Sequence, residues 1–220
     1  MSLTSRLFRG RQRPRLMRHP LKELLVNLVW RSGSRACEEK MQSLAPRAGK
    51  MANIGGGSHP ARWPGLPVCD ARIGGGDFNT APLPHPSESL DTIICEQVIE
   101  HLHNTTWFIS ELHRILKPGG TLLISTEDLC SWPNRLAMML NITPFSLQPC
   151  CGKYMGGWKT GATNGAGLPP NHPCYSGTAG HVRVLSRRQL VELLAEAGFR
   201  IGPVHRFAFG HYILVKAGKP

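Results

Sequence analysis

The central part of the chain has the pattern of a strand, a helix and a second strand. Residues 90–95 are an apolar, β-branched run of the kind that is buried in a parallel sheet. Apolar residues then recur on one helical face from Thr105 onward, at Phe108, Ile109, Leu112, Ile115 and Leu116. Residues 117–120 (KPGG) end that helix, and residues 121–126 form the next strand. Strands that alternate with helices predict an α/β sheet.

Two short strands and a glycine turn precede this unit. Residues 51–54 run into the glycine turn at 55–57, and residues 66–69 form a second short strand that ends on Asp70. An open α/β sheet binds ligands at the carboxyl ends of its strands. Glycines there let a ligand lie on the backbone, and a carboxylate can accept both hydroxyl hydrogens of a ribose. This pairing is shared by dinucleotide and adenosyl-cofactor sites, although a triple glycine is also a common flexible turn.

The last part of the chain predicts a loop, a helix and two strands. Residues 141–180 are rich in glycine and proline and have no periodicity, which is typical of a long loop that forms a lid. Residues 186–189 (SRRQ) have the residue types of a capping box, and the helix that they start ends at Gly198. Residues 199–204 and 208–215 are strand-like, and their short connection allows an antiparallel pair.

Positive charge is concentrated at the start of the chain. The 220 residues carry a formal charge of +12, and residues 1–50 hold twelve Lys and Arg against three Glu. Six arginines precede Pro20, as in nucleic-acid-binding tails, anionic-membrane contacts and transit peptides, and the alternative is a solvated arm. We expect a basic arm over residues 1–50, with an amphipathic helix at 20–30 and a connector at 31–50. The domain then covers residues 51–220.

Hydropathy and cysteine usage favour a cytoplasmic protein without a transmembrane segment. The apolar run at residues 24–30 is too short to span a bilayer or to act as a secretory signal. Four of the seven cysteines are far apart in the chain: Cys37, Cys69, Cys95 and Cys130. Such isolated cysteines usually behave as small buried hydrophobes. The group formed by Cys150-Cys151, His172 and Cys174 lacks the ligand pairs of structural zinc, so no metal is predicted.

Three segments resemble one enzyme family. Residues 91–102 read DTIICEQVIEHL, and residues 116–126 read LKPGGTLLIST. With the ending at residues 181–199 (HVRVLSRRQL, then LLAEAGF), they resemble class I S-adenosylmethionine-dependent methyltransferases of type 11. The resemblance covers about residues 50–215 and leaves the 141–180 loop unmatched. It implies a Rossmann-like methyltransferase fold, with a mostly parallel central sheet and a C-terminal antiparallel strand pair.

The resemblance also implies which residues bind S-adenosyl-L-methionine. Asn53, Gly55 and Gly57 occupy the family's first glycine motif, beside the methionine part of the cofactor. Asp70 matches the acid that binds the ribose hydroxyls.

Two further pairs of residues match later parts of the family's cofactor site. Asp77 and Phe78 match the acidic and apolar step that borders the adenine. Glu96 and Gln97 follow the strand at residues 90–95, which corresponds to the family's fourth strand, where side chains face the methyl group and the acceptor.

The chain departs from the family between its first two strands. Most members have a helix there, but Pro60, Pro64 and Pro67 prevent one of useful length, so the first helix after the glycine loop is missing or shortened. This resembles shortened variants among envelope- and glycan-associated methyltransferases. S-adenosylmethionine has no phosphate for a helix N-terminus to hold, whereas a dinucleotide would lose its pyrophosphate site. The departure therefore favours the adenosyl cofactor.

Catalysis needs a general base only when the acceptor loses a proton as it attacks. The candidates are His101, Glu96 and His181, with Glu100 beside them. His101 could instead orient the turn after the strand by hydrogen bonding. Glu96, Glu100 and His101 also resemble the cation ligands of some quinone-ring methyltransferases, but their spacing differs by one residue.

The acceptor is less constrained than the cofactor. Base N-methyltransferases carry an Asn/Asp-Pro-Pro-aromatic motif after the fourth strand, and this chain has no such motif there. Trp132, Trp158 and Tyr175 could line a pocket for an acceptor or anchor the lid. We therefore expect a small-molecule, lipid or glycan acceptor. The alternatives are an RNA- or ribosome-associated methyltransferase that uses residues 1–18, and a non-catalytic interaction protein; the same residues could also contact an anionic membrane surface.

Overall fold

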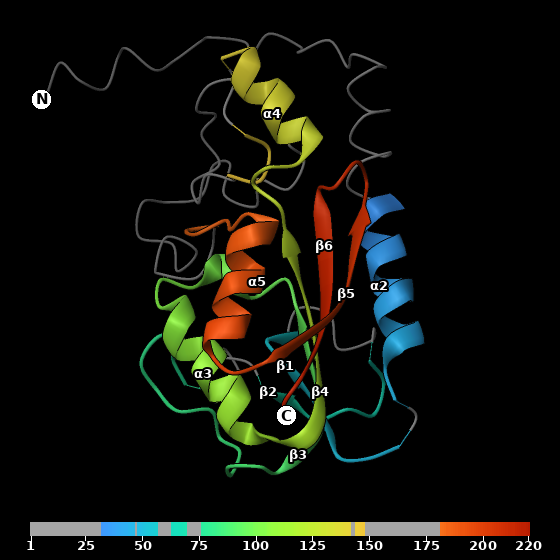
Figure 1. Ribbon diagram of the computed structural model, residues 1–220, viewed down its shortest axis with the longest axis vertical. Helices are drawn as coiled ribbons and strands as arrows, with labels where there is room; N and C mark the ends of the chain where they lie inside the picture. The colour runs from blue at the N-terminus through green and yellow to red at the C-terminus, as the bar shows by residue number, and fades with distance from the viewer. Residues whose placement is uncertain (1–31, 47, 57–62, 70–75, 142–143, 148–180) are drawn as a thin grey trace, which may run out of the picture.

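A six-stranded sheet forms the centre of the molecule (Figure 1). The structure is a computed structural model, and it describes residues 32–46, 48–56, 63–69, 76–141, 144–147 and 181–220. The strand order is β2-β1-β3-β4-β6-β5, in which β2, β1, β3 and β4 are mutually parallel and β6 is antiparallel to both of its neighbours. The strands are β1 Met51–Ile54, β2 Val68–Cys69, β3 Leu90–Glu96, β4 Leu116–Glu127, β5 Arg200–Phe207 and β6 Tyr212–Gly218. The predicted mostly parallel sheet with a C-terminal antiparallel pair is confirmed.

Helices cover both faces of this sheet. Figure 1 shows α3 (Thr105–Ile115) and α5 (Arg187–Glu196) on one face and α2 (Ser32–Leu44) on the other. Successive strand residues point to opposite faces, so Ile93 of β3 packs in the cluster that contains α3 and α5, while Ile94 packs in the cluster that contains α2. A parallel strand buried on both faces must be apolar throughout, which explains the apolar run at residues 90–95.

The two helices predicted from periodicity end where their sequences indicate. Asn104 caps α3 by accepting a hydrogen bond from the Trp107 amide, and the helix gives way to β4 at Leu116. Ser186 and Gln189 form both hydrogen bonds of the predicted capping box at the start of α5. Gly198 follows that helix with φ of +94°, a conformation that favours glycine.

The connector expected at residues 31–50 is wrong, because residues 32–44 form helix α2. Cys37 and Met41 are the apolar side chains that this helix buries, and they pack with Leu214 on the sheet. Gly33 lies so close to Ala208 that a Cβ there would overlap its side chain. A helix that buries two apolar side chains in thirteen residues gives too weak a periodic pattern to be recognised in the sequence. The boundary at residue 50 stays a prediction.

Two shorter elements lie at the carboxyl ends of β3 and β4. A 3₁₀ turn covers Ile99–His101, and helix α4 (Trp132–Met139) projects beyond the sheet (Figure 1).

No helix in the described part of the chain is long and apolar enough to cross a membrane. The arm helix at 20–30 and most of the predicted lid lie outside the described residues, as does the cysteine group at 150–174. Cys37, Cys69 and Cys95 are buried as predicted, whereas Cys130 is exposed.

Candidate active site

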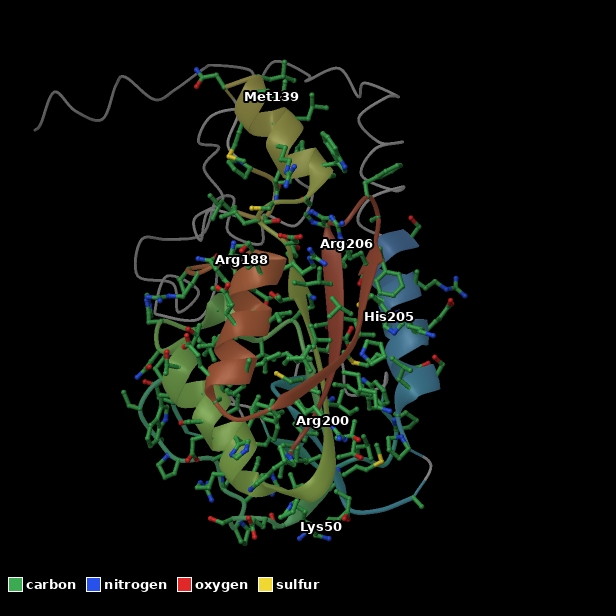
Figure 2. The ribbon with its side chains drawn as sticks, viewed as in Figure 1. Lys50, Met139, Arg188, Arg200, His205 and Arg206 are labelled. Atoms are coloured by element: carbon green, nitrogen blue, oxygen red, sulfur yellow. The ribbon has the colours of Figure 1, made fainter. Side chains whose placement is uncertain are left out.

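The candidate site lies at the carboxyl edge of the parallel strands. β1 leads into Gly55, β3 ends at Glu96 and β4 ends at Glu127. Parallel strands bring their carboxyl ends to one edge of a sheet, which is where open α/β sheets bind ligands. Lys50, before β1, and Met139 of α4 mark the opposite ends of the molecule in Figure 2, so the edge that carries the site faces α4.

The glycine turn after β1 is a close-packed cradle. Gly55 has φ of +85°, and a Cβ there would overlap the side chain of Val98. A Cβ on Gly56 would overlap the amide of Asn53. Asn53 is buried, and its Oδ1 has no hydrogen-bond partner among the described residues. A buried acceptor without a partner beside a turn that excludes side chains fits a ligand that brings a donor group.

The structure leaves two predicted cofactor residues outside its described part, Gly57 and Asp70. The residue before Asp70 is nevertheless fixed beside the glycine turn, because Cys69 pairs with Ile54 and its carbonyl accepts a hydrogen bond from the Gly55 amide. The register of β1 and β2 therefore suits the predicted pairing of glycine turn and acid.

The predicted adenine-side residues are placed differently from each other. Phe78 is buried and stacks on Phe108 with ring centroids 5.6 Å apart, so its ring belongs to the core. Asp77 is exposed, and its Oδ1 accepts hydrogen bonds from the amide and side chain of Asn79 at 3.0 and 2.8 Å. These bonds hold the pKa of Asp77 below its ordinary value. Asn79 in turn accepts from the His103 amide at 2.7 Å, which joins this loop to the site.

A turn after β3 carries the next group of predicted residues. Half-buried Glu96 ends the strand, and Gln97 follows with φ of +54°, which turns the chain away from the sheet. Glu100 is fully buried in the 3₁₀ turn and accepts a hydrogen bond from Thr126 Oγ1 at 2.8 Å. With its amide turned to suit both neighbours, Gln97 also donates to Glu100 Oε1 at 3.0 Å. Burial raises the pKa of Glu100, and the nearby His181 and His101 only partly offset this effect.

His181 reaches this turn from a segment eighty residues further along the chain. The main-chain carbonyl of Glu100 accepts hydrogen bonds from the amides of Val182 and Arg183. The rings of His101 and His181 make an edge-to-face contact with their centroids 4.9 Å apart. His181 Nδ1 lies 2.6 Å from the carbonyl oxygen of Ser146. A carbonyl can only accept, so Nδ1 carries the hydrogen and Nε2 of the neutral ring has the lone pair that takes up a proton.

Sequence reasoning missed a second buried carboxylate in the site. Glu127 Oε2 lies 3.6 Å from His181 Nδ1 and 3.6 Å from His211 Nε2. Burial raises the pKa of Glu127, but the neighbouring His211 and His181 outweigh burial and lower it, so this carboxyl stays ionised. The pairing of Glu127 with Tyr212 in the antiparallel strands brings His211 into place. The one signal in the sequence is an acid at the end of β4, because the parallel strand β3 ends at the same edge of the sheet.

Glu100, His101 and His181 could also hold a divalent cation. One ligand atom from each lies within 4.8 Å of the others. A carboxylate with two imidazoles is a donor set that zinc and similar ions accept. Glu96, which the sequence grouped with Glu100 and His101, is not part of this group.

A family model and a sequence relative agree with the geometry of this edge. A model described as a methyltransferase domain matches residues 20–203. A probable S-adenosylmethionine-dependent methyltransferase from Mycolicibacterium smegmatis is 33% identical over 135 residues, which is 61% of this chain and 37% of that protein. The chain thus spans little more than a third of the length of this curated relative.

Two solved structures share the fold at low identity. An S-adenosylmethionine-dependent methyltransferase from Thermotoga maritima, described as a possible histamine N-methyltransferase, matches with a TM-score of 0.55 and 18% identity over 91% of this chain and 95% of that chain. The Burkholderia thailandensis 1,6-didemethyltoxoflavin-N1-methyltransferase, whose structure contains S-adenosylhomocysteine, matches with a TM-score of 0.51 and 14% identity over 90% of this chain and 86% of its own. The Rossmann-like methyltransferase fold is therefore confirmed.

Proposed function

The chain belongs to the methyltransferase domain family, and on this premise we propose that it is an S-adenosylmethionine-dependent methyltransferase acting on a small-molecule, lipid or glycan acceptor. The observation that carries the proposal is the contact between the glycine turn and the turn after β3. Gly55 packs directly against Val98, which lies between Glu96 and Glu100. A cofactor on the glycine turn would thus lie beside the buried carboxylates and histidines.

The cofactor would be held by residues from three strand ends. Asn53 Oδ1 offers an acceptor to the ammonium of the methionine part, and the absence of side chains at Gly55 and Gly56 lets the turn pack closely on Val98 and Asn53. Gly57 would complete the glycine motif. Asp70 would take the ribose hydroxyls. When bound, S-adenosylmethionine supplies an electrophilic methyl group on its sulfonium and leaves as S-adenosylhomocysteine.

Asp77 and Gln97 complete the proposed cofactor contacts. Exposed Asp77 keeps its carboxylate ionised at the adenine side, whereas Phe78 acts through the core, by fixing the loop that carries Asp77. Gln97, held by Glu100 and the Thr126 amide, borders the methyl group.

We assign His181 as the general base for an acceptor hydroxyl or amine. Its Nδ1–H is fixed on the Ser146 carbonyl, which leaves Nε2 to take the acceptor proton as the acceptor lone pair attacks the methyl carbon. The ionised carboxylate of Glu127, 3.6 Å from Nδ1, stabilises the imidazolium that forms. His101 contacts the ring of His181 and positions it, and Glu96 faces the acceptor.

The cofactor part of the proposal is tested without knowing the acceptor. Isothermal titration of the full chain with S-adenosylhomocysteine should show binding that Asp70→Ala weakens by about tenfold or more, as expected for the loss of hydrogen bonds to a charged group. Asp91→Ala is the matched control, because Asp91 lies near the start of β3, at the opposite edge of the sheet, and pairs with Lys117. No binding by the native chain would contradict the proposal and leave a non-catalytic interaction protein.

The acceptor class is tested by labelled methyl transfer to an extract that is divided into lipid, glycan, RNA and small-molecule fractions. The proposal expects label in one of the fractions other than RNA, and labelling that is slower by about a hundredfold or more with His181→Ala. Label confined to RNA would contradict the acceptor class and favour the second candidate function.

RNA association is that second candidate, because residues 1–18 carry six arginines and no acid. RNA binding through this arm should fall steeply with added salt and disappear when the six arginines are replaced by glutamine. Binding that survives these replacements would contradict it. We also place the protein in the cytoplasm, a reducing compartment that suits a buried thiol such as that of Cys95.

A further inference from the structure

The exposed large hydrophobic side chains of the described residues gather at one end of the molecule. They are Trp132, Leu136, Met138, Met139, Leu140, Leu147, Val182 and Phe209. Five of them lie in α4 or directly after it, and the Trp132 amide donates to the carbonyl of Phe209 at 3.3 Å. Figure 2 shows Met139 at the tip of the molecule, beyond the carboxyl edge of the sheet. Exposed apolar side chains gathered in this way mark an interaction surface.

Helix α4 is turned with its apolar side outward. Trp132, Leu136, Met139 and Leu140 follow helical spacing on one face, which we name the outer face of α4, and each is more than half exposed. The positions that α4 buries are Asn134 and Ala137, a polar and a small residue. A helix stabilised only by packing on this protein would have the opposite arrangement.

Hydrogen bonds fix the direction of this outer face. The side-chain amide of Asn134 donates to the Asp128 carbonyl at 2.9 Å and to Ser146 Oγ at 2.7 Å, and its Oδ1 accepts from the Ser146 amide at 3.2 Å. Buried Asn134 thus ties α4 to both flanking segments. The exposure of the outer face is therefore set by the fold.

In the described part of the chain, arginines lie beside the outer face. The guanidinium of Arg135 lies 5.5 Å from the centre of the Trp132 ring. Arg187 and Arg206 are exposed at the adjoining ends of α5 and β5, and Figure 2 shows Arg206 on the side of the molecule toward α4. The chain as a whole carries a formal charge of +12. This charge favours an anionic occupant over a neutral one.

We propose that the outer face of α4, with Phe209, inserts into an anionic lipid surface. Helices that lie in a membrane interface combine tryptophan, phenylalanine and leucine on one face with basic residues, and here α4 supplies the tryptophan and leucines while the neighbouring turn supplies Phe209. Two turns of helix bury little apolar area, so such binding needs the electrostatic attraction that the arginines provide. The surface does not depend on methyl transfer, although it would bring the proposed site close to acceptors held in a membrane.

The experiment is co-sedimentation of the full chain with vesicles of phosphatidylcholine alone and of phosphatidylcholine with phosphatidylserine. The chain should bind the anionic vesicles, and added salt should weaken binding. Leu136→Asp should lower the partition coefficient by about tenfold or more, because it removes one large side chain from the lipid and adds a repelled charge. Met138→Asp makes the same change on the side of α4 away from the outer face and should bind nearly as the native chain does. Thermal unfolding checks that both variants fold.

A second variant tests insertion directly. Brominated lipids should quench part of the tryptophan fluorescence of the bound native chain, and Trp132→Phe should bind as well but lose that part of the quenching. Absence of anionic vesicle binding, equal binding by Leu136→Asp and native chains, or an equal loss with Met138→Asp would overturn the proposal. So would a chain that is dimeric by sedimentation and becomes monomeric with Leu136→Asp, because the outer face would then bind a second copy.

Discussion

Two buried clusters of this protein use glutamate in opposite ways. Glu111 of α3 receives two hydrogen bonds from Arg114 at 2.7 Å and one from the Leu83 amide at 2.8 Å, and the Arg114 side chain lowers its pKa. Glu100 at the carboxyl edge has a hydroxyl and an amide as partners, and burial raises its pKa. The first carboxylate is fully paired and fastens the loop before β3 to α3. The second is kept in a costly environment, which is typical of residues held for chemistry.

The largest effect should come from His181. With His181→Ala, methyl transfer should slow by about 10²–10⁴-fold, the usual contribution of a general base, while S-adenosylhomocysteine binding is retained. Single-turnover measurements with the labelled cofactor give the rate. Unfolding in urea is the control, and a rate within threefold of the native rate would exclude His181 as the base.

Glu111→Gln should cost stability and leave chemistry alone. Removing one partner of a largely buried ion pair destabilises by several kcal/mol, and partial exposure of Arg114 reduces this to about 2–3 kcal/mol. Because the folded pKa of Glu111 is lowered, the lost stability is present above the ordinary value of 4.5 and disappears as the pH falls below it. Urea unfolding at neutral and acidic pH measures this. A variant as stable as the native chain at neutral pH would remove the contrast between the clusters.

A smaller effect is expected from Glu127→Gln, which removes the carboxylate beside His181. The rate should fall about tenfold, the equivalent of roughly one pKa unit of interaction. Single-turnover measurements with the labelled cofactor give the rate, and a rate within threefold of the native rate would contradict this role of Glu127.

The sequence indicated the sheet, both capped helices and the turn after β3, because each depends on local periodicity or on a cap. It did not indicate Glu127, His211 or Ser146 as parts of the site. These residues meet His181 only through the antiparallel register of β4 with β6 and through the loop bonds to Asn134. Helix α2 was not predicted for a related reason, since its packing depends on only two buried apolar side chains and on the close approach of Gly33 to Ala208.

Replacing Glu100 by glutamine, the change proposed for Glu111 in the paired cluster, tests the carboxyl edge most directly. A raised folded pKa means that native Glu100 binds more protons than the unfolded chain, so its contribution to stability falls as the pH rises above 4.5. Glutamine at position 100 carries no charge and so removes that loss, and Gln97 and Thr126 can still hydrogen-bond to its side chain. The decisive measurement is the free energy of unfolding of Glu100→Gln in urea at neutral pH. A value equal to or above that of the native chain is expected, and a loss as large as that of Glu111→Gln would contradict the account.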